Sequence, residues 1–275
     1  MNLFFLGDCH GSAYSIEHFY FNYIKDTPKE QEENWLILLG DAGFLYYLNQ
    51  KDDAFKKVVS RLPIKYFVIR GNHEARASNV ASVYPDKWEQ IELFENICWR
   101  EKDYPNIYYA RDDGGIYWIE GRKILVIPGA YSVDKHYRLQ QGWTWFPDEQ
   151  MTQEEMDKMF EENNGNDFDL VLSHTCPYRY RPTDLFLSVI DQSTVDTSME
   201  QFMDKLHDHI WFNIWLWGHY HADRVEAPYC EILFNEPENL ENLESRWHNY
   251  RETGGLDWWL PKAPNFYMFE NKEGE

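Results

Sequence analysis

Short apolar runs recur along the chain and are separated by longer, mixed stretches. Runs of this length without interruption are typical of strands that are covered on both faces. They predict six buried strands, at residues 2–6, 35–39, 65–69, 123–127, 169–172 and 213–217. The pattern "GGIYWIEGRKILVI" over residues 114–127 further predicts a hairpin that turns at "EGRK".

Helical periodicity appears between several of these runs. After the first run, apolar positions follow the spacing of an amphipathic helix with Ser12 or Ser15 as its cap; they are Ile16, Phe19, Tyr20, Tyr23 and Ile24. Further helices are expected at residues 51–60, 152–163 and 197–210. Strands that alternate with helices predict an α/β sandwich. Because the chain has no linker-like segment, we expect one domain over residues 1–275, with residues 222–275 as a C-terminal extension packed on it.

Polar residues follow directly after five of the six predicted strands. The chain continues there into "GDCHG", "GDAG", "RGNHE", "SH" and "GHYH". In α/β sheets the carboxyl ends of strands border the ligand crevice, so these residues are expected to converge. His219 and His221 alternate around Tyr220, and in an extended backbone they would leave the same face roughly 7 Å apart. Cys9, between Asp8 and His10, should point the other way as a small buried residue.

The convergent residues offer carboxylate, amide and imidazole donors but no thiolate. They are Asp8, His10, Asp41, Asn72, His174, His219 and His221. This set suits manganese, iron, zinc or a similar ion and differs from a structural zinc site. Seven donors exceed the needs of one transition metal and fit two ions roughly 3.5–4 Å apart. Taken singly, each has an ordinary alternative: an aspartate caps a helix and a histidine lies in a loop.

Charge and cysteine content narrow the partners. Lys and Arg number 26 against 47 Asp and Glu, a net charge of -21, which opposes binding to nucleic acid backbones and anionic membranes. No apolar run reaches the length of a membrane span, and the first residues lack the features of a signal peptide. Four scattered cysteines, Cys9, Cys98, Cys176 and Cys230, favour reduced thiols. We therefore expect a cytoplasmic protein with no membrane partner.

In this order, "GDCHG", "GD", "GNHE", "SH" and "GHYH" over residues 7–221 resemble the calcineurin-like metallophosphoesterase superfamily, whose motifs run GDxHG, GD, GNH(E/D), H and GHxH. The resemblance implies a four-layer αββα sandwich of two mixed sheets flanked by helices. It also implies two divalent ions, with Mn²⁺ as the first expectation. One ion would be held by Asp8, His10, Asp41 and His221, and the other by Asp41, Asn72, His174 and His219. His73 would be the acid/base histidine.

One departure from the superfamily separates this chain from its phosphoprotein phosphatase branch. That branch continues the second motif as GDxVDRG, and here Phe44 and Leu45 replace its Asp and Arg. The segment "GAYSVDKHYR" instead resembles small bacterial and phage metallophosphoesterases. Arg70, Arg138 and Arg179 are candidates for binding substrate phosphate through a guanidinium fork, with surface salt bridges as the alternative.

The predicted function is a metal-dependent phosphoesterase. Its substrate would be a phosphomonoester or a small phosphodiester, with a phosphopeptide included, and nucleic acid is not expected as a partner because the chain is strongly acidic. Two alternatives stay open. One is a nuclease or phosphodiesterase that acts on nucleic acid, and the other is a non-catalytic binding scaffold with the same fold.

Overall fold

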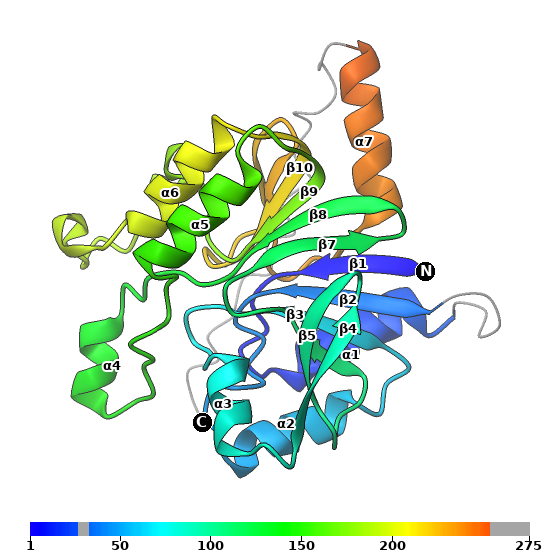
Figure 1. The fold of residues 1–275 in the computed structure, drawn as a ribbon, viewed down its shortest axis with the longest axis vertical. Coiled ribbons are helices and arrows are strands. Elements are labelled where there is room, and N and C mark those ends of the chain that lie inside the picture. The colour runs from blue at the N-terminus through cyan, green and yellow to red at the C-terminus, as the bar shows by residue number, and fades with distance from the viewer. Residues whose placement is uncertain (27–32, 254–275) are drawn as a thin grey trace, which may run out of the picture.

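Two β-sheets face each other, and helices cover their outer faces (Figure 1). The computed structural model of the chain describes residues 1–26 and 33–253. Both sheets are mixed, and three apolar layers separate the four layers of secondary structure. The αββα sandwich expected from the sequence is confirmed.

The first sheet has seven strands in the order β13-β1-β2-β3-β6-β5-β4. Strands β1, β2, β3 and β6 run parallel, and the strands at both edges pair antiparallel. The bounds are β1 Asn2–Leu6, β2 Asn34–Leu39, β3 Lys65–Ile69, β4 Trp88–Leu93, β5 Asn96–Glu101, β6 Ile107–Tyr109 and β13 Glu238–Asn239.

The second sheet has six strands in the order β11-β12-β10-β9-β8-β7. Its four inner strands are parallel, and β7 and β8 form the predicted hairpin. The bounds are β7 Gly115–Ile119, β8 Arg122–Ile127, β9 Asp167–Ser173, β10 Trp211–Trp217, β11 Arg224–Ala227 and β12 Cys230–Ile232.

Helices α1 to α3 lie beside the first sheet and α5 and α6 beside the second, whereas α4 stands apart (Figure 1). Ser12 caps α1, as expected, but the predicted continuous helix ends at Phe19 and goes on as a π-helical turn, Tyr20–Ile24. The bounds are α1 Ala13–Phe19, α2 Gln50–Val59, α3 Ala77–Val83, α4 Lys135–Gln141, α5 Gln153–Asn163, α6 Ser198–His207 and α7 Leu240–Thr253. Short 3₁₀ turns occupy Tyr178–Tyr180, Thr183–Leu185 and Gln192–Thr194.

Apolar packing explains the departure at the second motif. Phe44 and Leu45 are buried in the layer between the first sheet and its helices, where the Phe44 ring stacks on Phe55 with centroids 5.0 Å apart. A charged pair at these two positions would lose its hydration there. The same layer contains Cys9, which points away from the crevice as expected. All four cysteines are buried and free of disulfides.

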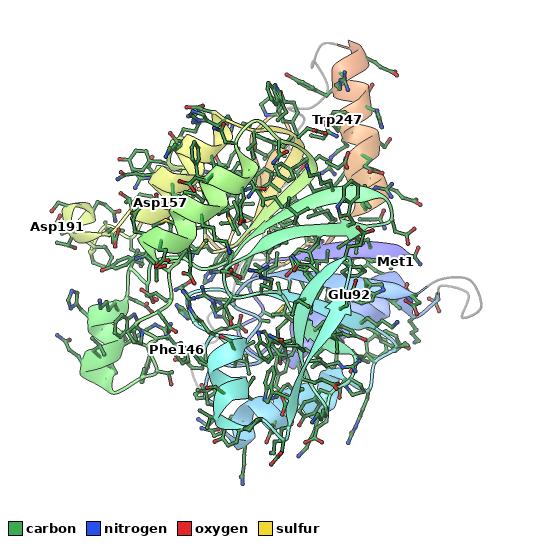
Figure 2. The ribbon with its side chains drawn as sticks, in the orientation of Figure 1. Met1, Glu92, Phe146, Asp157, Asp191 and Trp247 are labelled. Carbon is green, nitrogen blue, oxygen red and sulfur yellow. The ribbon has the colours of Figure 1, made fainter. Side chains whose placement is uncertain are left out.

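The described part of the expected extension, residues 222–253, contributes to both sheets. Strand β12 pairs with β10, and β13 pairs with β1. Helix α7 follows, and its Trp247 packs against the apolar layer between the sheets (Figure 2). Residues 254–275 lie outside the described residues. Among the helices of the described residues, none combines the length and apolar character needed to cross a membrane.

Candidate metal centre

The carboxyl ends of strands from both sheets meet at one crevice. Loops after β1, β2 and β3 of the first sheet and after β9 and β10 of the second carry the polar residues of the motifs there. In chain order these are Asp8, His10, Asp41, Asn72, His73, His174, His219 and His221. Three groups among them place their ligand atoms within 4.8 Å of one another: Asp8 with His10 and His221, His10 with Asp41 and His73, and Asp8 with Asp41 and His174.

Asp8, His10 and His221 form the first half of the site. Asp8 Oδ1 lies 3.9 Å from His10 Nε2 and 3.6 Å from His221 Nε2, and the two Nε2 atoms are 2.9 Å apart. The other oxygen, Oδ2, accepts a hydrogen bond from the His219 backbone N–H at 2.7 Å. Asp8 Oδ1 is buried and has no hydrogen-bond partner among the described residues. A cation between these three side chains would compensate that oxygen.

Asp41, Asn72, His174 and His219 form the second half. His174 Nδ1 donates to the Leu39 carbonyl at 2.7 Å, because a carbonyl oxygen only accepts. Its other ring nitrogen, Nε2, lies 2.8 Å from Asn72 Oδ1 and 3.6 Å from Asp41 Oδ2. Both oxygens are acceptors, so Nε2 carries a proton here, and against the lowering effect of burial Asp41 raises the pKa of His174 to about 9. A cation between these atoms would take the place of that proton. The His219 ring lies beside that of His174, with centroids 5.0 Å apart.

Asp41 occupies the middle of the crevice. It belongs to one group with His10 and to another with Asp8 and His174, so it faces both halves. Its Oδ1 accepts a hydrogen bond from the His73 backbone N–H at 2.8 Å. Burial acts to raise the pKa of Asp41, but the neighbouring imidazoles, His174 first among them, hold the pKa well below its usual range. The carboxylate is therefore ionised and suited to bridge two cations.

Four of the residues in the crevice have a left-handed backbone. The φ angles are 47° at His10, 49° at Asp41, 67° at His219 and 51° at His221. Such angles are uncommon outside glycine and concentrate at functional sites. The expectation that His219 and His221 leave one face of an extended backbone is therefore wrong. The local turn sends His221 to His10, with ring centroids 4.9 Å apart, and sends His219 to His174.

The motif glycines leave space for the buried side chains. A Cβ atom on Gly71 would lie 2.0 Å from Asp41 Oδ1, and one on Gly40 would lie 2.0 Å from His174 Nδ1. Gly40 also has φ +94°, a conformation that other residues rarely adopt. Any side chain at these two positions would displace a residue of the crevice.

A hydrogen-bonded chain behind Asn72 was not predicted from the sequence. Asn72 Nδ2 donates to Ser132 Oγ at 2.8 Å, and Ser132 Oγ donates to Glu149 Oε2 at 2.5 Å. The Trp145 ring N–H also donates to that oxygen, at 2.8 Å. Because the amide nitrogen is held from behind, the amide oxygen of Asn72 faces the crevice. Ser132 lies 60 residues after Asn72, and no short motif links them.

His73 lies at the edge of the crevice in contact with Arg138. Arg138 Nη2 is 2.6 Å from His73 Nδ1, and the same guanidinium donates to the Tyr46 hydroxyl and to Asp134 at 2.8 Å each. A guanidinium only donates, so the His73 nitrogen that it contacts accepts. Burial and then the charge of Arg138 lower the pKa of His73, against the opposite effect of Asp41.

The other two candidate substrate arginines lie elsewhere. Arg70 is 5% exposed, and its Nη1 donates to the Glu149 carbonyl at 2.6 Å. Arg179 pairs with Asp204 at 2.7 Å and with Asp208 at 2.8 Å. The structure does not bring Arg70 or Arg179 to the crevice, because nearer polar partners hold both side chains. Arg179 forms surface salt bridges, which was the alternative to phosphate binding. Only Arg138 of the three reaches the site.

Carboxylate, amide and imidazole donors at the carboxyl edge of an α/β sandwich form a candidate metal-binding site. The sequence model of the calcineurin-like phosphoesterases matches residues 1–223, and the chain belongs to this family. A similar solved structure is described as a novel archaeal phosphodiesterase. It shares 11% sequence identity and a TM-score of 0.31, over 65% of this chain and 74% of that one. No curated protein matches the chain.

We predict that Ser132→Ala weakens Mn²⁺ binding by about 10- to 100-fold, because Asn72 loses the contact that orients its amide. Calorimetric titration with Mn²⁺ measures the change. Ser82→Ala is the matched control, since the Ser82 hydroxyl bonds only to the Asn79 carbonyl on the exposed side of α3. Equal affinities of Ser132→Ala and Ser82→Ala would contradict the role of Ser132.

Proposed function

We propose that the chain is a metal-dependent phosphoesterase that hydrolyses phosphomonoesters or small phosphodiesters with two divalent ions. The observation that carries this proposal is the buried, unpartnered oxygen of Asp8 together with the central carboxylate of Asp41, which faces two groups of nitrogen and oxygen donors. Membership of the calcineurin-like phosphoesterases supports the class of reaction.

The donors fit two ions in the arrangement that the motifs imply. Asp8, His10 and His221 would hold one ion, Asn72, His174 and His219 the other, and Asp41 would bridge them. His219 suits its role because burial and the charge of His174 lower its pKa to about 3, which keeps a lone pair available. Bound ions of this kind neutralise phosphoryl oxygens and lower the pKa of a water, and mixed oxygen and nitrogen ligands favour Mn²⁺ or a similar ion such as Fe or Zn.

His73 would move the proton, and Arg138 would orient its ring. The His73 ring is 16% exposed and lies 3.9 Å from Asp41 Oδ2, within reach of a substrate in the crevice. Asp134 Oδ1 lies 3.9 Å from His73 Nε2 and would stabilise the protonated ring. Because Phe44 replaces the orienting Asp of the phosphoprotein phosphatase branch, Asp134 and Arg138 are the groups that fix this histidine here. A proton passed from His73 to the leaving oxygen would complete the cleavage.

Chelation should abolish activity, and Mn²⁺ should restore it, since the donors lie in a crevice that the fold forms itself. Asp41→Ala should remove both ions because it deletes the bridge, whereas Asn72→Ala should weaken one. Metal content per chain by elemental analysis, read beside activity, measures these effects. Full activity after chelation would refute the metal-dependent mechanism. Two ions per chain in Asp41→Ala would refute only the bridging role of Asp41.

His73→Ala should lower kcat by about 10² to 10⁴ while metal content stays nearly intact, because the side chain is proposed to transfer a proton. The matched control is His136→Ala on α4, an exposed histidine two residues before Arg138. A substrate with a poor leaving group gives the clearest readout, since its departure depends most on protonation. Unchanged turnover of that substrate would exclude His73 from catalysis.

Small substrates should be preferred over nucleic acid. The net charge of -21 opposes a polyanion, and a backbone-binding protein loses affinity steeply as salt rises. An aryl phosphate, a phosphopeptide, a cyclic nucleotide and single- and double-stranded DNA would compete under Mn²⁺ at low and moderate salt. Efficient, salt-sensitive DNA cleavage with the monoesters untouched would favour the nuclease alternative. No turnover of any substrate despite bound metal would favour the scaffold.

A further inference from the structure

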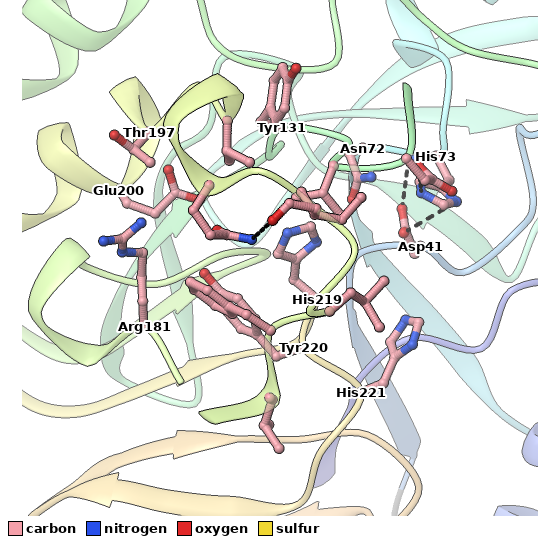
Figure 3. A pocket seen from close by; sticks show the side chains of 18 residues that line it. Asp41, Asn72, His73, Tyr131, Arg181, Thr197, Glu200, His219, Tyr220 and His221 are labelled. Atoms are coloured by element: carbon pink, nitrogen blue, oxygen red, sulfur yellow. Dashed lines mark hydrogen bonds and ion pairs between the residues drawn. The ribbon is translucent and has the colours of Figure 1, made fainter. Parts of the chain in front are cut away.

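A cavity of about 390 Å³ opens directly beside the candidate metal centre. One end is formed by Asp41, Asn72, His73 and His219, and Figure 3 shows Glu200, Arg181 and Thr197 at the opposite end. Eight of its 18 lining residues come from the segment between β9 and α6, whose outer tip carries Asp191 (Figure 2). We refer to this cavity as the substituent pocket, and its volume is sufficient for a small ring system.

The walls of the substituent pocket are apolar and partly aromatic. Tyr131, Phe186 and Tyr220 line it, and the rings of Phe186 and Tyr220 lie nearly parallel, at 18°. At the rim, Leu185 is 41% and Leu187 59% exposed. Apolar side chains left exposed around a cavity are typical of a surface that contacts a ligand. A phosphoryl group needs no such walls, so they point to the organic part of the substrate.

Glu200 provides a buried acceptor at the end away from the metal centre. The residue is 5% exposed, and its Oε1 accepts a hydrogen bond from Thr175 Oγ1 at 3.0 Å. Its Oε2 is buried and has no hydrogen-bond partner in residues 1–26 and 33–253. Burial raises the pKa of Glu200 to about 7, which shows that the protein itself compensates this carboxylate incompletely. A donor on a ligand would supply the missing contact.

Arg181 adds a flat cationic surface close to Glu200. Its guanidinium carbon lies 3.5 Å from the centroid of the Tyr178 ring and 5.8 Å from that of Phe186. Its Nε donates to the Tyr178 carbonyl at 3.3 Å. A planar guanidinium in such a position can stack on a ring of the ligand.

We propose that the substituent pocket binds the organic substituent of the phosphoester, and that this substituent is a planar ring with N–H donors that Glu200 accepts. The inference rests on the proposed function, which places the phosphoryl group at the metal centre. Aromatic walls select the ring, and the Glu200 carboxylate in its ionised form selects a donor on it. Both an aminophenyl ring and an amino-substituted nucleobase have this chemistry.

Two pairs of substrates that differ only in one amino group test the proposal. They are 4-aminophenyl phosphate against phenyl phosphate, and guanosine against inosine 5′-monophosphate, with glycerol phosphate as a substrate without a ring. We expect kcat/KM of the wild-type protein to favour the amino member of at least one pair by about tenfold, the effect of one hydrogen bond to a charged group. The pair that responds distinguishes the two kinds of ring.

Glu200→Met should bring that ratio close to one, and glycerol phosphate hydrolysis, measured for the same variant, reports any separate loss at the metal centre. Glu200→Gln keeps one acceptor oxygen and should retain part of the preference. It provides a second test if Glu200→Met fails to fold. Glu161→Met on the exposed face of α5 is the matched control and should behave as the wild type. Leu187→Ser should raise KM for both members of the responding pair.

Binding of phosphonates separates this proposal from the proposed function. Calorimetry under Mn²⁺ would compare 4-aminophenylphosphonate, phenylphosphonate and methylphosphonate, none of which needs to be hydrolysed. Tighter binding of the amino compound, lost in Glu200→Met, supports the proposed pocket even if no ester is cleaved. Absence of cleavage would overturn only the proposed phosphoesterase activity. Hydrolysis of all esters with no preference, and no effect of Glu200→Met on either measurement, overturns the pocket.

Discussion

Two buried carboxylates at the junction of the sheets impose the main constraint on this structure. Asp8 is 4% and Asp41 2% exposed, and one oxygen of each accepts a hydrogen bond from a backbone N–H of a neighbouring loop. Taking such charges out of water is costly unless they are compensated. The remaining oxygens face imidazoles, so the crevice concentrates negative charge and lone pairs in one small volume. The need to compensate these charges accounts for the imidazoles that surround them.

The loops around the carboxylates are held by the sheets beneath them. Left-handed backbone at His10, Asp41, His219 and His221 is unfavourable by itself and persists only where the surroundings fix it. Here each loop leaves a buried strand, and the apolar layer between the two sheets joins those strands firmly. The Ser132 and Glu149 contacts add rotational control of Asn72. Stability in the core thus offsets strain at the edge.

Local patterns predicted the parts of the structure that depend on neighbouring residues. The six buried strands and the convergence of polar loops at their carboxyl ends were predicted because each is a short apolar run followed by a polar loop. Strands β4 and β5 were missed, since most of their residues are exposed or half-buried and their sequences look mixed. The contact of Ser132 with Asn72 and the two ends of the substituent pocket form between residues far apart in the sequence. No short motif spacing predicts such contacts. His219 and His221 were misplaced because the turn after β10 is not extended.

The family region and the folding unit do not coincide in this chain. The calcineurin-like phosphoesterase match ends at residue 223, yet β12 and β13 follow it and cover the edges of β10 and β1. A fragment cut at residue 223 would keep every residue of the metal centre but leave two strand edges with unpaired N–H and C=O groups. Open edges of this kind pair with other chains. Self-association would then compete with folding in such a fragment, so the family region depends on the strands that follow it to cover its edges.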